Sequence, residues 1–334
     1  MNKSSLKIRS ELYPLRFEPI LKEVIWGGGD IRPFKGLTSD EKKIGESWEL
    51  SHVEGNCSVV ADGALKGLSI DELIARYGTS LLGKQVMERF GTRFPLLIKF
   101  IDARDDLSVQ VHPNDELAQT RHNSFGKTEM WYLVKASAEA SLLSGFSQQI
   151  DAAEYRRRVA EGSFTEVLQR YNVKAGDVFF LPAGRVHAIG AGCFIAEIQQ
   201  TSNITYRIYD YQRRDANGNE RELHTDLACE AIDYQVYHDY RTHYTHLPDC
   251  PVNIAKCKYF TVNMLEISKP YANNMTTLDT FIIYICIQGG AVISDNNGNE
   301  TTLRQGQTVL VPASTASVII TPFDEAKLLE VMIN

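Results

Sequence analysis

The sequence lacks the hallmarks of several protein classes. Its six cysteines stand at positions 57, 193, 229, 250, 257 and 286 and form no C-x-x-C pair, which argues against both a zinc knuckle and a disulfide framework. No apolar run approaches the roughly 20 residues that a membrane helix needs. The first ten residues, MNKSSLKIRS, contain no apolar core of a signal peptide. We therefore expect a protein of the reducing cytoplasm.

Positive charge is also in deficit. The 334 residues include 35 lysines and arginines against 42 aspartates and glutamates, a formal net charge of −7. A chain of this sign is poorly suited to nucleic acid or to an anionic membrane, so we expect neither partner. The hydrophobic fraction of 43% is ordinary for a globular protein, and the length suggests two domains.

What the sequence has in quantity is short strand-like segments. They are rich in β-branched and aromatic residues and are bounded by turn formers. Many strands with few helices indicate a sandwich or barrel architecture. The expected strands are 48–53, 94–101, 107–111, 129–134, 177–181, 193–199, 259–267, 280–288, 308–312 and 316–321, with a tight hairpin turn at 295–300.

Three helices are expected. One begins after Ser69 in a capping box, a second after Asp151, and a third after Ser163, ending near Tyr171. The three arginines at 156–158 in the second helix are expected to face solvent.

Two segments of the chain repeat one pattern. GDVFFLPAGRVH (176–187) and GQTVLVPASTAS (306–317) share a glycine, an apolar strand and a proline at a constant offset of 130 residues. The second copy has serine where the first has Gly184 and His187. The repeat predicts two related β-barrels, of which only the first carries the polar residues of a site.

The stretch SVQVHPND (108–115) places Gln110 and His112 on one face of a strand, opposite Val109 and Val111. A buried amide and imidazole need a common partner. Each of them alone would be an ordinary core or strand residue. Taken with Glu129, which opens the apolar strand EMWYL, and with His187, they indicate a metal site. These ligands suit zinc, with manganese, iron and nickel left open.

The chain resembles one family. Gly-x5-Pro-x-Gly-x2-His is similar to a motif of the cupin superfamily, whose barrels hold a metal inside. The segments IWGG (25–28), GESWELS (45–51), FPLLIKF (94–100), SVQVHPND, KTEMWYL (127–133), PAGRVHAIG (182–190) and EIQQTSNITYRIYDY (197–211) resemble the type I mannose-6-phosphate isomerases in their short bacterial form.

The resemblance implies a fold. It is mainly β, with two cupin-type β-barrels (jelly-roll, bicupin) and a few short helices in or beside the N-terminal barrel. We expect a catalytic domain at 1–248 with helical insertions at about 69–90 and 151–172, and a degenerate barrel without metal ligands at 249–334.

The resemblance also implies an activity. Members are zinc-dependent aldose–ketose isomerases that interconvert mannose 6-phosphate and fructose 6-phosphate through a cis-enediolate, in mannose metabolism and GDP-mannose supply. One Zn²⁺ per chain is expected on Gln110, His112, Glu129 and His187.

The resemblance suggests roles for other residues as well. Arg207 would stabilise the enediolate, and either Glu197 or Lys127 would move the proton, while a hydride shift stays open. Longer members carry a histidine before the lysine of KTE, where this chain has Gly126. The substrate, a small sugar phosphate, would contact Lys99, Trp26, Gly27, Gly28, Ser47 and Ser108.

Two rival functions remain open at this stage. One is another metal-cupin enzyme, such as an oxygenase or an isomerase of a different sugar phosphate, and the other is a sugar sensor without catalysis. Arg207 and the two lysines favour chemistry. His238, His243 and His246 are expected to lie in a linker and not in a second metal site, His52 is expected to be structural, and the chain is expected to be a monomer or a weak homo-oligomer.

Overall fold

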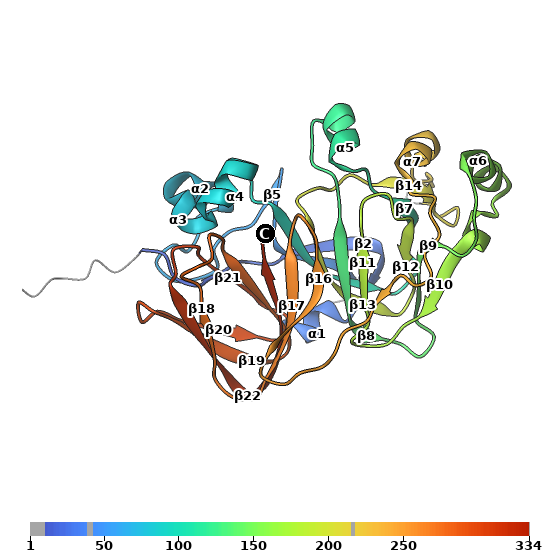
Figure 1. Ribbon diagram of the computed structural model, residues 1–334. Coiled ribbons are helices and arrows are strands. Elements are labelled where there is room, and N and C mark those ends of the chain that lie inside the picture. Colours follow the sequence, from blue (N-terminus) through green and yellow to red (C-terminus); the bar gives the residue numbers. More distant parts are fainter. Residues whose placement is uncertain (1–10, 39–42, 215–217, 334) are drawn as a thin grey trace, which may run out of the picture. The chain divides into compact units, whose positions relative to one another are not determined.

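The computed structural model of the protein describes residues 11–38, 43–214 and 218–333 (Figure 1). The N-terminal segment on which the signal-peptide expectation rests lies outside these residues. Contacts divide the described chain into two compact units. The central unit contains residues 19–57 and 95–244, and the flanking unit contains residues 11–18, 58–94 and 245–333. The domain boundaries expected from the sequence stay a prediction.

The central unit consists of two antiparallel sheets. A seven-stranded sheet has the order β15-β11-β8-β13-β6-β2-β3, and a five-stranded sheet has the order β10-β9-β12-β7-β14. The strands of the first are β2 (Ile20–Gly28), β3 (Ile44–Leu50), β6 (Leu96–Ala103), β8 (Glu129–Ala136), β11 (Val178–Leu181), β13 (Cys193–Gln200) and β15 (Arg241–Thr242). Those of the second are β7 (Val109–Val111), β9 (Ser141–Phe146), β10 (Leu168–Asn172), β12 (His187–Ile189) and β14 (Tyr206–Tyr209), and a small hairpin joins β4 (His52–Val53) to β5 (Asn56–Cys57).

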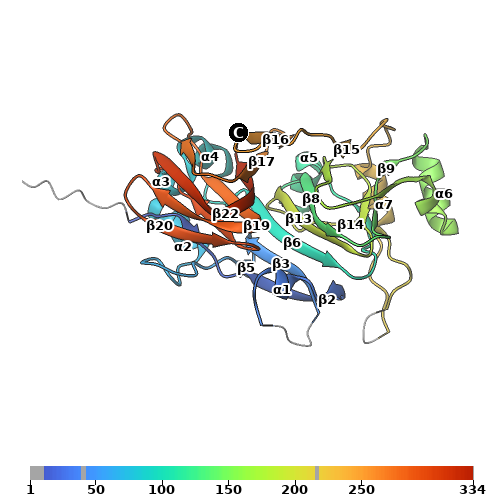
Figure 2. The ribbon, with the colours of Figure 1, turned by 90° about the horizontal axis from the view of Figure 1, so that it is seen from below.

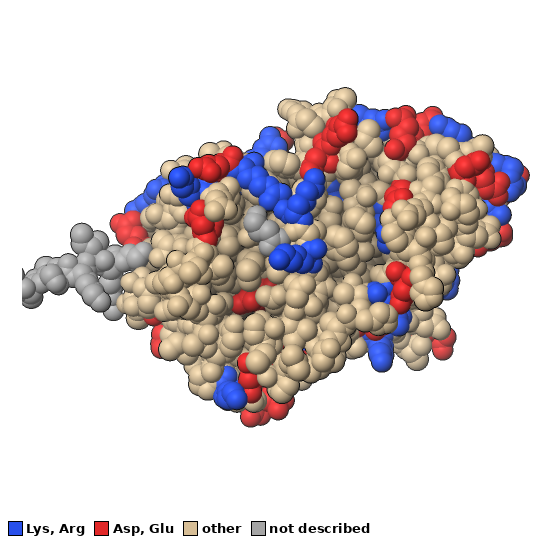
Figure 3. Space-filling model, in the orientation of Figure 1, with Lys and Arg blue, Asp and Glu red and all other residues tan. Residues whose placement is uncertain are grey.

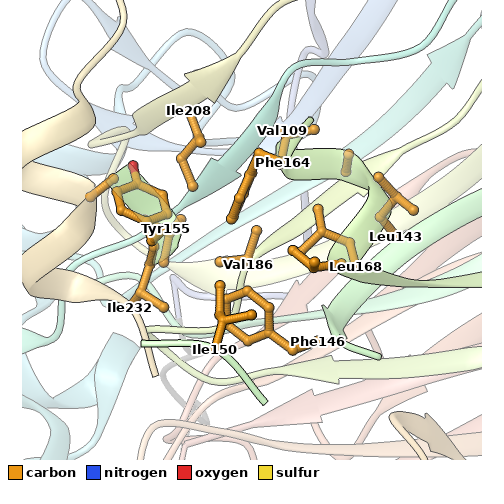
Figure 4. Packing of buried hydrophobic residues seen from close by; sticks show 14 of the residues in the cluster. Val109, Leu143, Phe146, Ile150, Tyr155, Phe164, Leu168, Val186, Ile208 and Ile232 are labelled. Carbon is orange, nitrogen blue, oxygen red and sulfur yellow. The ribbon is translucent and has the colours of Figure 1, made fainter. Parts of the chain in front are cut away.

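Helices cover the outer face of each of these sheets. Tyr155 of α6 (Ala152–Glu161) and Cys229 of α7 (Thr225–Ala231) join the hydrophobic cluster that forms on the five-stranded sheet (Figure 4). Figure 2 shows α1 (Ile31–Phe34) beside β3. Phe34 of this helix packs edge-on against Phe100 and Phe194, with ring centroids at 5.2 and 4.8 Å. The inner faces of the two sheets are thereby left to face each other.

The flanking unit is built on one eight-stranded sheet. Its main path is β1-β21-β19-β22-β17-β16, with β18 on β22 and β20 on β19. The strands are β1 (Leu15–Arg16), β16 (Pro251–Lys256), β17 (Thr261–Ile267), β18 (Tyr271–Asn274), β19 (Ile282–Asp295), β20 (Glu300–Arg304), β21 (Thr308–Val311) and β22 (Ser317–Met332). Three helices belong to it as well, α2 (Ile70–Tyr77), α3 (Thr79–Leu82) and α4 (Lys84–Phe90), whereas α5 (Asp115–His122) belongs to the central unit.

The expectation of a mainly β fold is confirmed, and so is the internal repeat. Gly176 and Gly306 both take positive φ, 90° and 75°. After the strand that follows each glycine, the amide of Arg185 bonds the carbonyl of Pro182 at 3.0 Å, and the amide of Thr315 bonds that of Pro312 at 3.0 Å. Both turns therefore close in the same way, 130 residues apart.

Two of the three expected helix starts are confirmed, and the third is wrong. Ser69 and Asp151 are side-chain caps of α2 and α6. After Ser163 the chain makes only a short 3₁₀ turn, Phe164–Val167, and then enters β10, which pairs with β9. The expected helix over 163–171 fails because pairing with a neighbouring strand outweighs local capping.

The surface carries charges of both signs side by side. Figure 3 shows acidic and basic groups intermingled where Figure 1 draws α6. In that helix Arg157 pairs with Glu154 and Glu161, and Arg156 pairs with Asp226, so these two arginines face solvent as expected. Arg158, with its side chain only 16% exposed, packs against Glu154 instead. Within the described ranges, no helix combines the length and apolarity needed to cross a bilayer.

Candidate metal centre

Three of the four expected ligands come from neighbouring strands of the five-stranded sheet. His187, at the start of β12, lies directly opposite Gln110 of β7. Val109 and Val186, next to them in the chain, point into the hydrophobic cluster of Figure 4. Because side chains alternate along a strand, Gln110 and His187 point the other way, and His112, two residues after Gln110, follows on the same side.

The fourth expected ligand comes from the opposing sheet. Glu129 opens β8 and is fully buried. Its Oε2 lies 3.5 Å from Nε2 of His112, and its Oε1 lies 3.3 Å from Nε2 of His187. The three side chains form one of the groups of potential metal ligands among the described residues.

Backbone carbonyls fix the tautomer of both imidazoles. Nδ1 of His112 lies 2.9 Å from the carbonyl oxygen of Ile204, and Nδ1 of His187 lies 2.8 Å from that of Arg185. A carbonyl only accepts, so each Nδ1 carries the proton and each Nε2 presents a lone pair. Metal-binding histidines are commonly oriented in this way.

The lone pairs of these two Nε2 atoms face the carboxylate oxygens of Glu129. Nε2 of His112 and Oε1 of Glu129 are buried and have no hydrogen-bond partner, and Oε2 of Glu129 has only the ammonium of Lys127, at 2.9 Å. Such unpaired buried acceptors would repel one another unless a cation lay between them. The residues therefore fit a metal ion.

Gln110, the remaining expected ligand, lies beside His187 and can turn either end of its amide toward it. Its Nε2 lies 3.3 Å from Nε2 of His187. A half-turn of the amide would bring Oε1 to this position, and the two orientations have nearly the same shape. Gln110 is thus placed to offer an oxygen ligand.

Burial sets the protonation of the ligands. It lowers the pKa of His187 to about 4 and that of His112 well below its usual value, so that both are neutral at pH 7. Burial raises the pKa of Glu129 to about 7, against the opposing pull of Lys127, whose Nζ lies 2.9 Å from Oε2. Neutral imidazoles and a carboxylate near its titration point are ready to bind a cation.

A second buried network adjoins the ligands. Glu197 of β13 accepts a hydrogen bond from Nε1 of Trp131 at 2.9 Å, and its other oxygen lies 3.4 Å from Nζ of Lys99. Lys99 also lies 3.8 Å from Glu46. Burial would raise the pKa of Glu197, but Lys127 and Lys99 outweigh it and hold the pKa below its ordinary value.

A divalent cation would reverse the net charge of this region. Three carboxylates, Glu46, Glu129 and Glu197, face two ammonium groups, Lys99 and Lys127, so the full ionised set sums to −1. A divalent ion would bring the sum to +1, the sign that attracts an anion.

Two partners in this network were missed by sequence reasoning. Trp131 lies two residues after Glu129 on the same strand face, and its ring meets His187 edge-on at 5.2 Å. Glu46 lies two residues before Trp48 and accepts a hydrogen bond from Nε1 of the Trp48 indole. Alternation along the two strands was the signal that could have found both.

Arg207 lies on β14 directly opposite Gln110, on the inward face. Its Nη1 donates to the carbonyl of Glu222 at 3.0 Å, and its Nε is buried without a partner. Burial and the neighbouring Arg221 lower the pKa of this guanidinium. β14 thus brings Arg207 beside Gln110, although the guanidinium of Arg207 donates to the backbone carbonyl of Glu222.

The expected substrate contacts fare unevenly. Trp26 is buried in a hydrophobic cluster with Ile101 and Trp131. A Cβ on Gly27 would lie 2.7 Å from the amide nitrogen of Gly45, and one on Gly28 would lie 2.3 Å from the carboxylate of Asp102. Strand packing therefore accounts for these glycines, and the Asp102 carboxylate beside them opposes an anion.

The two serines lie on different sides. Trp48 pairs with Lys99 on the inward face, so Ser47 points outward, where it donates to Glu49 at 2.5 Å. The structure therefore does not bring Ser47 to the ligand group. Ser108 is buried and lies two residues before Gln110, on its side of the strand.

By the resemblance noted above, Gly126 stands where longer members of the family would carry a histidine. A Cβ there would lie 2.6 Å from backbone atoms of both Asn114 and Asp115. The chain therefore has no space for a side chain at this point.

Replacing Gly126 with alanine is accordingly expected to destabilise the protein by about 1–3 kcal/mol, because the clashing atoms belong to the backbone and cannot rotate away. Chemical denaturation would measure this cost. The matched control is Gly29→Ala, where an added Cβ meets nothing within 4 Å. Equal stability of the two variants would contradict the close packing of Gly126.

The histidines outside the site have other partners. His243 pairs with Asp239 at 2.8 Å, and His246 pairs with Glu266 at 3.3 Å. The expectation that the 238–246 segment is a linker stays a prediction.

Two opposed sheets holding a buried His/Glu/His group inside define a metal-binding cupin. Residues 15–133 match the phosphomannose isomerase type I catalytic domain, and residues 252–328 match the mannose-6-phosphate isomerase cupin domain. The chain is 38% identical over 285 residues to mannose-6-phosphate isomerase ManA of Bacillus subtilis, covering 84% of this chain and 88% of that one. It is 34% identical over 311 residues to the probable mannose-6-phosphate isomerase GmuF of the same organism, covering 90% and 94%.

A solved structure agrees with these matches. The crystal structure of a mannose 6-phosphate isomerase from Bacillus subtilis superposes with a TM-score of 0.85 at 28% identity, covering 96% of this chain and 99% of that one. The chain belongs to the type I mannose-6-phosphate isomerase family, and the expected cupin fold and isomerase activity are confirmed.

Proposed function

We propose that the protein is a zinc enzyme that interconverts mannose 6-phosphate and fructose 6-phosphate through a cis-enediolate. The observation that carries this proposal is the convergence of two imidazole Nε2 atoms on the buried carboxylate of Glu129, at 3.5 and 3.3 Å. Imidazole and carboxylate ligands suit zinc, and a bound ion would polarise the sugar oxygens as a Lewis acid.

The protein groups then divide the work. Glu197 is held ionised by Lys127 and Lys99, which is the form that accepts a proton. Its lowered pKa makes it a weak base, and the Trp131 indole fixes one of its oxygens. Lys127, beside Glu129, is the cation nearest to the ligands and would donate to a developing oxyanion.

For Lys99 we propose a role other than the substrate contact expected from the sequence. Pairing with Glu46 and Glu197 raises its pKa despite burial, and Trp48 lies beneath its ammonium at 5.0 Å. These contacts favour Lys99 as the counter-ion of Glu197, with phosphate contact as a secondary role. The expected contacts of Ser108 stay a prediction.

Isotope exchange tests the enediolate. A proton that passes through Glu197 or Lys127 exchanges with solvent, so fructose 6-phosphate formed in D₂O would carry deuterium at C1. Product formed in D₂O with no deuterium is the result that a hydride shift predicts, and it would count against the enediolate route.

Zinc affinity is expected to rise about tenfold per pH unit below pH 7, because Glu129 must lose its proton before it can bind. The sign follows from its raised pKa: higher pH produces the charged, ligating form. His187, with a pKa of about 4, is already neutral and adds no further slope. Competition against a chelator at several pH values below 7 measures how zinc affinity changes with pH. A pH-independent affinity would contradict the prediction.

The cellular setting belongs to the proposal too. We infer a cytoplasmic enzyme of mannose metabolism that supplies the precursor of GDP-mannose and works as a monomer or weak homo-oligomer. Support comes from the acidic composition and from the absence of any disulfide among the six cysteines, all of which are described. Sedimentation of the purified chain tests the oligomeric part.

A further inference from the structure

The segment that carries Lys127 and leads into Glu129 is held by groups from other parts of the chain. It comprises residues 126–128, directly before β8. Each of its three backbone amides is satisfied from another part of the chain. The amide of Gly126 donates to Oδ1 of Asp115 at 3.1 Å, that of Lys127 to the carbonyl of Pro113 at 3.1 Å, and that of Thr128 to Oε1 of Gln200 at 2.8 Å.

The two side chains that accept these amides are themselves joined. Nε2 of Gln200 donates to the same Oδ1 of Asp115 at 3.1 Å. Gln200 is 3% exposed, so its amide has little access to water. Both ends of that amide are thus used inside the protein, and the bridge runs Thr128, Gln200, Asp115, Gly126.

The residues of the bridge also lie close in the chain to other parts of the site. Asp115 follows His112 by three residues, and Gln200 ends β13, the strand of Glu197. The hydroxyl of Thr128 accepts from the amide of Ala183 at 3.2 Å, and the amide of Gly184 donates to the carbonyl of His112 at 2.9 Å, which anchors the turn before His187.

Asp115 has an ordinary alternative role at the first position of α5, where an acidic residue is common. The recorded acceptor of the amide of Leu117 is, however, Asn114 and not Asp115. Oδ1 of Asp115 turns away to Gly126 and Gln200. Gln200 lies next to Gln199, which pairs with Glu129, so its side chain faces away from the metal and can act only through the backbone.

We propose that Gln200 and Asp115 are positioning residues, whose side-chain bridge holds the 126–128 backbone so that Lys127 and Glu129 meet the metal and the substrate. This inference rests on the proposed roles of those two residues. Loosening the bridge leaves every ligand present but lets the ammonium and carboxylate drift, and a shift of about 1 Å costs on the order of 10²-fold in rate.

Breaking the bridge tests it. Gln200→Glu keeps an acceptor for Thr128 but sets a carboxylate against Asp115, while Asp115→Ala removes the oxygen that accepts from both Gly126 and Gln200. Each of these variants is expected to lower kcat by roughly 10–100-fold with KM within about threefold. Asp115→Asn keeps an Oδ1 that can accept from both donors, and its kcat is expected to stay within about threefold of wild type.

Metal content and the thermal midpoint are measured on each variant, and zinc is supplied in excess. Asn273→Asp is the matched control, since this amide also donates to a buried carboxylate, Glu330, in the flanking unit, and its kcat is expected to stay unchanged. If Gln200→Glu does not fold, Asp115→Ala compared with Asp115→Asn still gives the comparison.

The proposal is overturned if folded, zinc-loaded Gln200→Glu and Asp115→Ala keep wild-type kcat, or if Asp115→Asn loses as much kcat as Asp115→Ala. A lowered thermal midpoint with unchanged kcat would assign the bridge to stability alone and would also overturn it. Failure of the wild-type chain to isomerise mannose 6-phosphate would instead sink the proposed function, so the two failures are distinguishable.

Discussion

Glu129→Gln is expected to abolish stoichiometric metal binding and to lower the isomerase rate by on the order of 10³-fold, since a Lewis acid supplies several kcal/mol to such a step. The substitution keeps the shape of the side chain and removes its charge. Glu129 alone bridges the two imidazoles, at 3.5 and 3.3 Å. Without it the two neutral histidines and an amide would hold a divalent ion weakly.

The matched control is Glu330→Gln. Glu330 is also buried on a strand, at 2% exposure, but it accepts hydrogen bonds from Tyr284, Asn263 and Asn273 and needs no cation. Its variant is expected to keep metal and rate. Elemental analysis and the coupled isomerase assay measure both variants, and a Glu129→Gln protein that kept one metal per chain and wild-type turnover would refute the proposed ligand set.

Arg207→Lys is expected to lower kcat by about 10²–10³-fold while KM changes little, because stabilisation of a developing oxyanion is felt in the transition state. Lysine keeps the charge but loses the planar fork that can meet two enediolate oxygens at once. β14 places Arg207 opposite Gln110, and its buried Nε lacks a partner in the absence of substrate.

Arg170→Lys serves as the control. Arg170 belongs to β10 of the same sheet, is exposed, and bonds the hydroxyl of Ser141 at 2.9 Å. Steady-state kinetics should separate the two arginines clearly. A KM effect alone at Arg207 would reassign it from the transition state to ground-state binding of the phosphate.

The ligand group could be predicted because its signals are local. Spacing of two puts Gln110 and His112 on one face, and the repeat with proline and glycine identifies the turn that delivers His187. The repeat also shows that Ser317 stands in the second copy where the first copy has His187. Strand alternation and turn chemistry depend on only a few neighbouring residues, so these features can be read from the sequence.

The surroundings of the ligands could not be predicted, because they depend on how strands pair. Alternation separates Ser47 from Trp48, but only the pairing of Trp48 with Lys99 reveals which of them faces inward. Gly27 and Gly28 follow the pattern of an anion loop, yet close contacts with Gly45 and Asp102 explain them. The segment after Ser163 had helix signals, and pairing with β9 made it a strand.

The most direct test of the account follows fructose 6-phosphate formed from mannose 6-phosphate by one preparation as purified, after chelation, and after zinc is returned. The account predicts activity that disappears with the chelator and returns as zinc reaches one equivalent per chain. Full turnover by a folded chain from which all metal has been removed would contradict it.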